Sequence, residues 1–164
     1  MIKSILLKTK RKKKQTYQIN DRKHDFLKDW KVVRYYIQKK YDISLGELEI
    51  LLHLYSCGPF TRSYFFQYAF LSNWDKSKLR RMMDQEYIYI YRKKSGSETR
   101  LYDLTHKAKY ICNLTYKKLS NEEPISENPR SNPMFSKDAS YTDRIYRRII
   151  EKMNRKINDP EDTD

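Results

Sequence analysis

The chain has 164 residues, in which 35 Lys and Arg stand against 21 Asp and Glu, so its formal net charge at neutral pH is +14. With 38% hydrophobic residues, a chain of this length supports one modest core, and we expect no two-domain enzyme. Its longest apolar runs, such as 87–91, are far shorter than the roughly 20 residues of a membrane-spanning helix. An excess of positive charge this large predicts a polyanionic partner, with nucleic acid ahead of an anionic membrane surface.

The N-terminal sequence predicts an intracellular protein. The apolar stretch 5–7 is too short for the central region of a signal peptide, and no small-residue cleavage site follows it. Cys57 and Cys112 are too few for a disulfide framework, so we expect two reduced, structural cysteines. The expected location is cytoplasmic, in association with a nucleoid or nucleoprotein or within a viral particle.

Positive charge is concentrated in residues 1–23, where nine Lys and Arg accompany one Asp and give a net charge of +8. The densest run repels itself and contains nothing to bury, so we expect 1–23 to be a flexible basic arm that lies along phosphates when bound. A solubilising tail is an alternative of equal weight. The arm residues expected to contact DNA are Lys10, Arg11, Lys12, Lys13 and Lys14.

The segment 24–120 contains nearly all of the periodic apolar pattern, and we expect it to form the folded domain. Apolar residues recur at helical spacing from Phe26 to Ile37, which predicts a helix over 25–39 with these residues on one face. This is the first expected helix.

A second helix is marked at both ends. Ser44 and Glu47 have the spacing of a capping box, in which the Ser hydroxyl accepts from a free helix amide and the Glu carboxylate accepts from the cap amide. Gly58 and Pro59 predict the stop, because Gly adopts the left-handed conformation and Pro blocks continuation.

Two short helices are expected next. Thr61 caps the first, which ends in a polar corner over 72–73. The second begins near Trp74 or Asp75 and ends near Gln85, with its apolar residues directed inward.

Beyond these helices the period of the pattern changes from about 3.6 residues to 2. The segments 87–91 and 99–102 are rich in strand-forming residues, and the basic segment 92–98 between them contains a Gly at the turn. We therefore expect a β-hairpin with a cationic tip. Thr105 then caps a fifth helix, over 106–119.

The remainder divides into a connector, a helix and a tail. Three Pro among Ser, Asn and Glu in 121–140 predict an extended connector. A second capping signature, at Ser140 and Asp143, begins an amphipathic helix over 141–158. The tail 159–164 is acidic, and we expect it to be solvated. The expected apolar stripe of the helix consists of Ile145, Ile149, Met153 and Ile157.

Three short helices, a basic helix and a basic hairpin follow one another in the order of a winged helix-turn-helix. The fold class expected is mainly α with a small β-hairpin wing, a winged helix-turn-helix core plus a C-terminal helix. A helix in the major groove needs cationic and hydrogen-bonding side chains, because base edges there carry the sequence information. The wing is expected to reach the adjacent backbone or minor groove. The expected recognition residues are Lys76, Ser77, Lys78, Arg80 and Arg81, and the expected wing contacts are Arg92, Lys93, Lys94 and Arg100.

Two junctions resemble the MarR type of winged helix-turn-helix, and the resemblance covers roughly 26–119. Leu-Thr-His-Lys-Ala-Lys at 104–109 is similar to that family's Leu-Thr-x-Lys-Gly-Arg, with Ala108 in place of Gly. Met-Asp-Gln-Glu-Tyr-Ile-Tyr at 83–89 is similar to its Leu-x-x-x-Gly-Leu-Ile, with Tyr87 in place of Gly. The resemblance implies sequence-specific binding of double-stranded DNA, transcriptional regulation and a homodimer, which here would use the first, fifth and sixth helices.

No catalytic, metal-binding or cofactor-binding pattern stands out, so we expect a non-enzymatic protein without a cofactor. His24, His53 and His106 lack the spacing of a zinc site, and three isolated Gly do not form a phosphate loop. No membrane partner is expected, because the last helix has no Trp or Phe to anchor at an interface.

Two alternatives remain open. A structural or adaptor protein of a viral particle or nucleoprotein assembly would use the winged fold for protein contacts, with the C-terminal helix packed on its own domain or on a partner. A replication-initiation or plasmid-maintenance factor would bind DNA with the same parts and act by recruitment.

Overall fold

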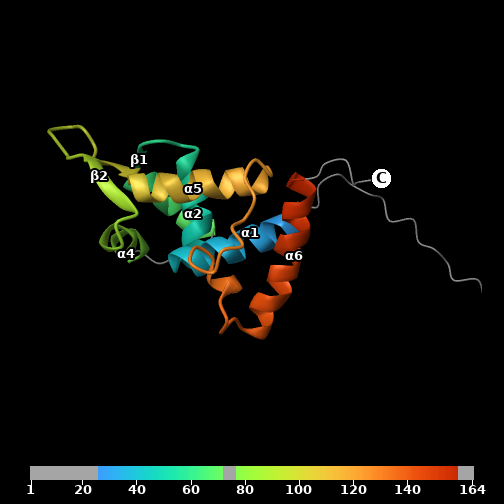
Figure 1. Ribbon diagram of the computed structural model, residues 1–164. Coiled ribbons are helices and arrows are strands. Elements are labelled where there is room, and N and C mark those ends of the chain that lie inside the picture. Colours follow the sequence, from blue (N-terminus) through green and yellow to red (C-terminus); the bar gives the residue numbers. More distant parts are fainter. Residues whose placement is uncertain (1–25, 72–76, 159–164) are drawn as a thin grey trace, which may run out of the picture.

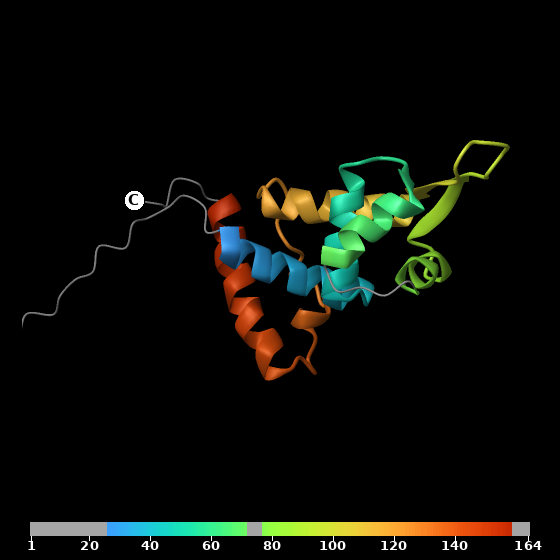
Figure 2. The same ribbon diagram turned by 180° about the vertical axis from the view of Figure 1, so that it is seen from behind.

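The computed structural model describes residues 26–71 and 77–158, and within them the chain is mainly helical with a small three-stranded antiparallel sheet (Figure 1). The expected basic arm of 1–23, Lys76 and the acidic tail of 159–164 lie outside the described residues. The sheet and α4 (Lys78–Asp84) lie at one end of the molecule, and α6 (Tyr141–Asn158) lies at the other (Figures 1 and 2).

Three helices form the centre of the core: α1 (Phe26–Tyr41), α2 (Leu45–Tyr55) and α5 (His106–Leu119). The start of α1 differs from the prediction. Phe26 was expected on the buried face but is 80% exposed. The fully buried part of α1 begins only at Val32. Side chains of these helices with no more than 1% exposure are Val32, Val33, Tyr36, Ile37, Leu48, Ile50, Leu51, Leu54, Ala108, Ile111, Cys112 and Thr115.

The helix starts predicted from capping residues are confirmed. Ser44 Oγ accepts from the Glu47 amide at 3.3 Å, and a Glu47 carboxylate oxygen accepts from the Ser44 amide at 3.0 Å. Ser140 and Asp143 make the same two bonds, at 3.1 and 3.0 Å. The Thr105 hydroxyl accepts from the amide three residues later at 3.3 Å. Each pair satisfies amides that have no partner inside the helix.

The sheet has the strand order β1-β3-β2 and is antiparallel throughout. The predicted hairpin is present as β2 (Ile88–Arg92) and β3 (Leu101–Leu104). A third strand, β1 (Phe60–Thr61), was not predicted, because two residues carry no recognisable alternation. It pairs with β3 and leads directly into α3 (Arg62–Leu71), so it holds that helix to the sheet.

Helix α4 ends with a non-glycine residue in the left-handed conformation. The Tyr87 amide donates to the Met82 carbonyl at 2.9 Å and the Glu86 amide donates to the Met83 carbonyl at 3.0 Å, which is the bond pair of a Schellman motif. The left-handed position of this motif is Glu86, with φ of 59°, and not Tyr87. A side chain there costs roughly 1–2 kcal/mol, so α4 is held in place at the expense of local strain.

The segment 121–140 is folded onto the domain, and is not the extended connector that its Pro content predicted. Ile125 and Met134 are buried, and 3₁₀ helix η1 (Pro133–Phe135) lies within it. The Asn154 side chain accepts from the Ile125 amide at 2.9 Å and donates to the Ile125 carbonyl at 2.8 Å. The Arg147 guanidinium donates to the Met134 carbonyl at 2.8 Å. Polar side chains of α6 thus form hydrogen bonds with backbone groups of this segment that are not paired in a helix or a sheet.

Helix α6 packs on α1 of its own chain. The Tyr35 hydroxyl donates to Asp143 at 2.8 Å, and the Tyr35 and Tyr146 rings are stacked with centroids 4.2 Å apart. Burial, together with the hydrogen bond to Asp143, raises the pKa of Tyr35 to about 12. The hydroxyl therefore keeps its proton at neutral pH and remains a donor to Asp143.

The predicted stripe of α6 is only partly the buried one. Met153 is 9% exposed, as expected, but Ile145 is 43% exposed. The most deeply buried side chains are instead Asp143, Ile150 and Asn154, whose spacing also defines a helical face. Polar residues on the buried face hid this face from a pattern based on apolar residues.

We expect Glu86→Gly to raise the free energy of unfolding by about 1 kcal/mol, because glycine adopts the left-handed conformation without a Cβ clash. Urea denaturation monitored by circular dichroism measures the change. The control is Asp84→Gly in the last turn of α4, which should lower stability by about 1 kcal/mol, since glycine is a poor residue inside a helix. Destabilisation by both variants would contradict the assignment of strain to Glu86.

Candidate nucleic-acid interface

The exposed face of α4 is centred on Arg80. Leu79 and Met82 are 5% and 0% exposed, and they hold the helix against the core. The Arg80 side chain is exposed and makes no hydrogen bond or ion pair with any residue in the described part of the chain. Ser77 is also exposed, at the N-cap of α4, and its side chain makes no capping hydrogen bond. These two predicted residues lie on the outer surface of the helix.

The other two predicted residues of α4 converge on one buried carboxylate. Glu47 is 2% exposed, and its Oε1 lies 3.3 Å from Lys78 Nζ and 2.8 Å from an Arg81 guanidinium nitrogen. The Lys78 side chain is only 18% exposed, whereas that of Arg81 is 56% exposed. Lys78 is therefore mainly a structural residue, and Arg81 combines an internal ion pair with an outward position.

Glu47 has two roles, of which the sequence indicated only one. One of its oxygens accepts from the amide and hydroxyl of Ser44, at 3.0 and 2.6 Å, and caps α2. The other oxygen binds the two cations of α4. Burial opposes ionisation, but the bonds from Ser44 and the charge of Lys78 outweigh it and lower the pKa of the Glu47 carboxyl. Glu47 thus links α2 to α4 through ion pairs. No local sequence pattern could have predicted this link.

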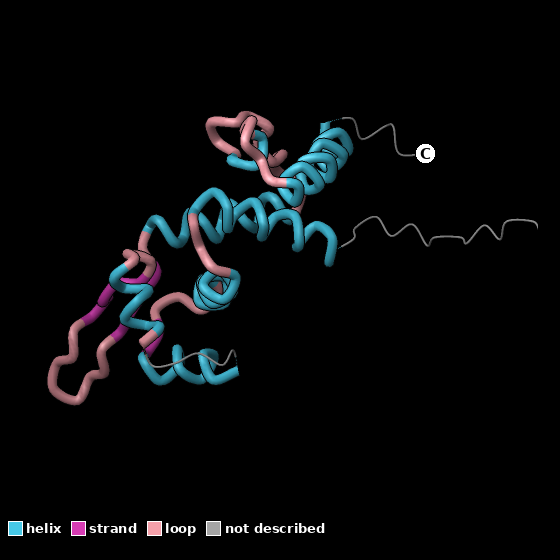
Figure 3. The backbone as a smooth tube through the Cα atoms, turned by 90° about the horizontal axis from the view of Figure 1, so that it is seen from below, coloured by secondary structure: helices cyan, strands magenta, loops and turns pink. Residues whose placement is uncertain are grey.

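The four predicted residues of the hairpin are all exposed: Arg92, Lys93, Lys94 and Arg100. Arg92 lies 3.5 Å from Glu98, but both side chains are about half exposed, so this ion pair contributes little. The other three make no hydrogen bond or ion pair within residues 26–71 and 77–158. Gly96 has φ of 57° and turns the chain at the tip. The hairpin projects away from the helical body, as Figure 3 shows.

The junction between α4, the hairpin and α5 fixes their relative positions. The Thr105 hydroxyl donates to the Glu86 carbonyl at 2.7 Å, and Lys107 Nζ donates to the Gln85 carbonyl at 3.2 Å. Lys107 also lies over the Tyr87 ring, 4.6 Å from its centroid. The segment 104–107 therefore binds the carbonyl end of α4, where a cation is favoured.

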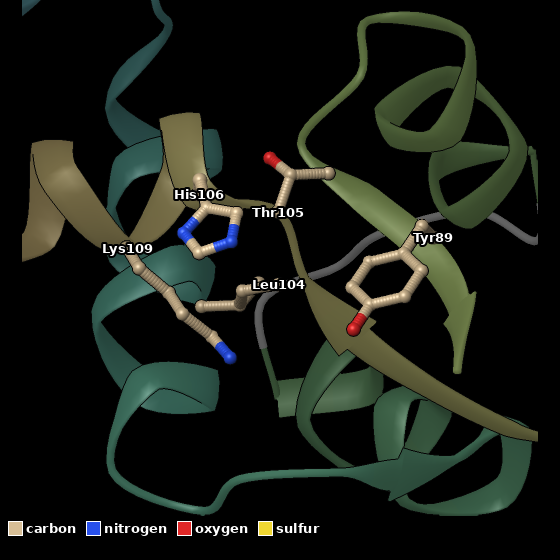
Figure 4. Close-up of a pocket in the computed structure, with 5 residues that line it drawn as sticks. All are labelled: Tyr89, Leu104, Thr105, His106 and Lys109. Atoms are coloured by element: carbon tan, nitrogen blue, oxygen red, sulfur yellow. The ribbon is translucent and has the colours of Figure 1, made fainter.

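An open hollow of about 400 Å³ lies beside this junction, with His106 and Lys109 facing Tyr89 across it (Figure 4). Lys109 already has an internal partner, because its ammonium donates to Asp103 at 2.7 Å, and this hydrogen bond raises its pKa. The hollow therefore has the character of a surface depression and not of a built ligand site.

Comparison with known proteins gives no relative: no protein-family model, curated protein or solved structure matches the chain. Among the described residues, no helix is long and apolar enough to cross a membrane. The same part of the chain contains no group of three or more His, Cys, Asp or Glu side chains placed to hold a metal ion.

We expect Glu47→Gln to lower the free energy of unfolding at pH 7 by about 1.5–3 kcal/mol, the usual contribution of hydrogen bonds to a charged group. Because folding lowers the pKa of Glu47 from 4.5, its stabilisation is complete above that value and is lost as the pH falls through the folded pKa. The difference between wild type and variant should therefore shrink between pH 5 and pH 3. Urea denaturation at several pH values measures it.

Glu49→Gln provides the matched control, since Glu49 lies in the same helix and its side chain makes no hydrogen bond or ion pair within the described part of the chain. It should change stability by less than about 0.5 kcal/mol at every pH. Equal effects of the two substitutions would contradict a stabilising role of the ion pairs that link Glu47 to α4.

Proposed function

We propose that the protein is a winged helix-turn-helix protein that binds double-stranded DNA and acts as a non-enzymatic transcriptional regulator. One observation carries the proposal: Arg80 and the hairpin residues Lys93, Lys94 and Arg100, whose side chains have no ion-pair or hydrogen-bond partner among the described residues, lie together at the end of the molecule formed by α4 and the sheet (Figures 1 and 2). The strand order β1-β3-β2, with a helix pair between β1 and the hairpin, supports the winged interpretation.

The division of the charges suggests a division of labour. A helix fits the major groove, where Arg makes bidentate hydrogen bonds to guanine, so Arg80 is proposed to read bases with Ser77 and Arg81 beside it. Lys93, Lys94, Arg92 and Arg100 are proposed to contact backbone phosphates or the minor groove. The arm residues 10–14, outside the described residues, are proposed to add affinity without specificity.

We expect selection from a random duplex library to return a sequence motif. Arg80→Ala should then lower discrimination between the selected site and random DNA by about 5- to 150-fold, because one good base contact contributes about 1–3 kcal/mol. The double variant Lys93→Ala/Lys94→Ala should weaken binding to both DNAs alike and lower the salt slope by about 2. Fluorescence anisotropy at several salt concentrations measures both.

Arg148→Ala is the control of equal charge, because Arg148 is exposed on α6 at the opposite end of the molecule. It should leave discrimination unchanged. Equal losses for Arg80→Ala and Arg148→Ala would refute the assigned interface, and no binding to random duplex DNA at low salt would refute the proposed function.

A protein-binding role, either alone or as dimerisation, is the second candidate. Phe26, Leu27, Tyr141 and Ile145 are 80%, 63%, 75% and 43% exposed, and apolar side chains of this size favour a protein contact. A homodimer through α1, α5 and α6 would place two copies of α4 on successive major grooves, about 34 Å apart. Light scattering of the full chain tests dimerisation. A dimer is expected, and a monomer at 100 micromolar would exclude the homodimer.

A further inference from the structure

A thiol, a phenol and an imidazole meet at the corner between α2 and α3. Cys57 Sγ lies 2.9 Å from the Tyr64 hydroxyl, and the same hydroxyl lies 3.3 Å from His53 Nε2. The sequence predicted Cys57 and His53 as unrelated structural residues, because they are separated from Tyr64 by a turn and a strand. The structure instead joins them in one hydrogen-bonded chain.

The imidazole of this cluster is held in position. Its ring is stacked on Tyr68 with centroids 3.9 Å apart and 14° between the planes, and it is nearly parallel to Tyr64 at 5.7 Å. Tyr64 and Tyr68 are both on α3, so the His53 ring packs α2 against α3. The hydrogen bond with Cys57 raises the pKa of the Tyr64 phenol, so the phenol is protonated at neutral pH and its hydroxyl can donate to His53.

The two cysteines differ in access. Cys57 is exposed, whereas Cys112 is fully buried, and burial raises the pKa of its thiol to about 12. The thiolate is the nucleophile in cysteine chemistry, so Cys112 is inert in the folded protein. Any thiol chemistry of the native chain therefore takes place at Cys57.

We propose that Cys57 is a site of covalent modification by soft carbon electrophiles of the α,β-unsaturated carbonyl class, and that Tyr64 and His53 form the proton relay that activates it. The thiol proton moves to the Tyr64 oxygen while the hydroxyl proton moves to His53 Nε2, which leaves a thiolate and an imidazolium. The sulfur lone pair forms a C–S bond at the β-carbon, and the C=C electrons move to the α-carbon as an enolate. The proton on the imidazolium is returned to that carbon, directly or through water, so no group leaves and there is no net oxidation.

Modification has a structural consequence for α3. The Tyr64 amide donates to Thr61 Oγ1 at 3.2 Å, so Tyr64 lies in the first turn of α3 as well as in the relay. An adduct on the sulfur occupies the place of the Tyr64 hydroxyl and forces this turn away from His53. Because α3 follows directly on β1, which pairs with β3 of the hairpin, a displacement of α3 should also move the hairpin and weaken DNA binding, a consequence that rests on the proposed function.

The test is the rate of modification of the full chain by 2-cyclohexen-1-one at pH 7, followed by intact mass and peptide mapping. We expect one adduct, at Cys57, and none at Cys112. Tyr64→Phe keeps the ring and removes the relay, and it should lower the rate constant about tenfold or more and change the shape of the pH–rate profile. Tyr68→Phe is the matched control and should stay within about twofold of wild type, because Tyr68 contacts His53 by its ring face.

The outcomes are distinct. Equal rates for wild type, Tyr64→Phe and Tyr68→Phe would overturn the relay, and so would an unchanged pH–rate profile in a folded His53→Gln variant. Absence of an adduct at Cys57 would overturn the site. In a separate anisotropy measurement, the adduct should weaken DNA binding about fivefold or more, with Cys57→Ser insensitive to the reagent. Equal DNA binding before and after modification would overturn the consequence for the hairpin, whereas no DNA binding by the unmodified protein would refute the proposed function and leave the rate measurements valid.

Discussion

The buried carboxylate of Glu47 is the constraint on which the arrangement of this molecule depends. It begins α2 by accepting from Ser44, and it holds α4 through Lys78 and Arg81. Helix α4 has only seven residues, too few to be stable on its own, so its position must be imposed by its surroundings. Glu47 imposes it on one side, and the bonds from Thr105 and Lys107 to the end of α4 impose it on the other.

Ion pairs with buried carboxylates also separate the cations that are neutralised near the core from those that face outward. The ion pairs of Glu47 and of Asp103 each neutralise cations close to the core. Arg80 and the hairpin cations have no such buried partner among the described residues. A net charge of +14 is therefore weak evidence by itself, since charge that is paired inside the fold cannot attract a polyanion. The proposed DNA contacts rest on the cations that remain.

Much of the fold could be predicted from the sequence, because capping residues act over three positions. Ser44, Thr105 and Ser140 each begin a helix where their spacing predicts one. Interactions between distant parts of the chain could not be predicted in this way. Glu47 meets Arg81 across 34 positions, and Asn154 meets Ile125 across 29, and no local pattern contains such pairs. The strand β1 was missed because two residues carry no recognisable alternation, and the buried face of α6 was missed because it includes the polar residues Asp143 and Asn154.

In the candidate site, the exposure of the hairpin residues and of Arg80 agrees with the prediction that they face solvent, since a charged side chain without a nearby acid remains outside. The internal engagement of Lys78 and Arg81 was not foreseen, because it depends on a carboxylate in another helix. In the MarR-type motif that 83–89 resembles, Tyr87 stands at the position of Gly. The residue in the left-handed conformation is Glu86, one position earlier.

The contact between Tyr35 and Asp143 spans 108 positions, and it has a consequence for the order of events during synthesis. A chain emerging from the ribosome exposes the side of α1 that carries Tyr35 until the residues of α6 have been synthesised. Contacts between residues so far apart form late, because closing a long loop costs entropy before the contact repays it. The nascent chain therefore passes through a period in which α1 is covered on one side only, and the arrival of α6 ends its exposure to aggregation.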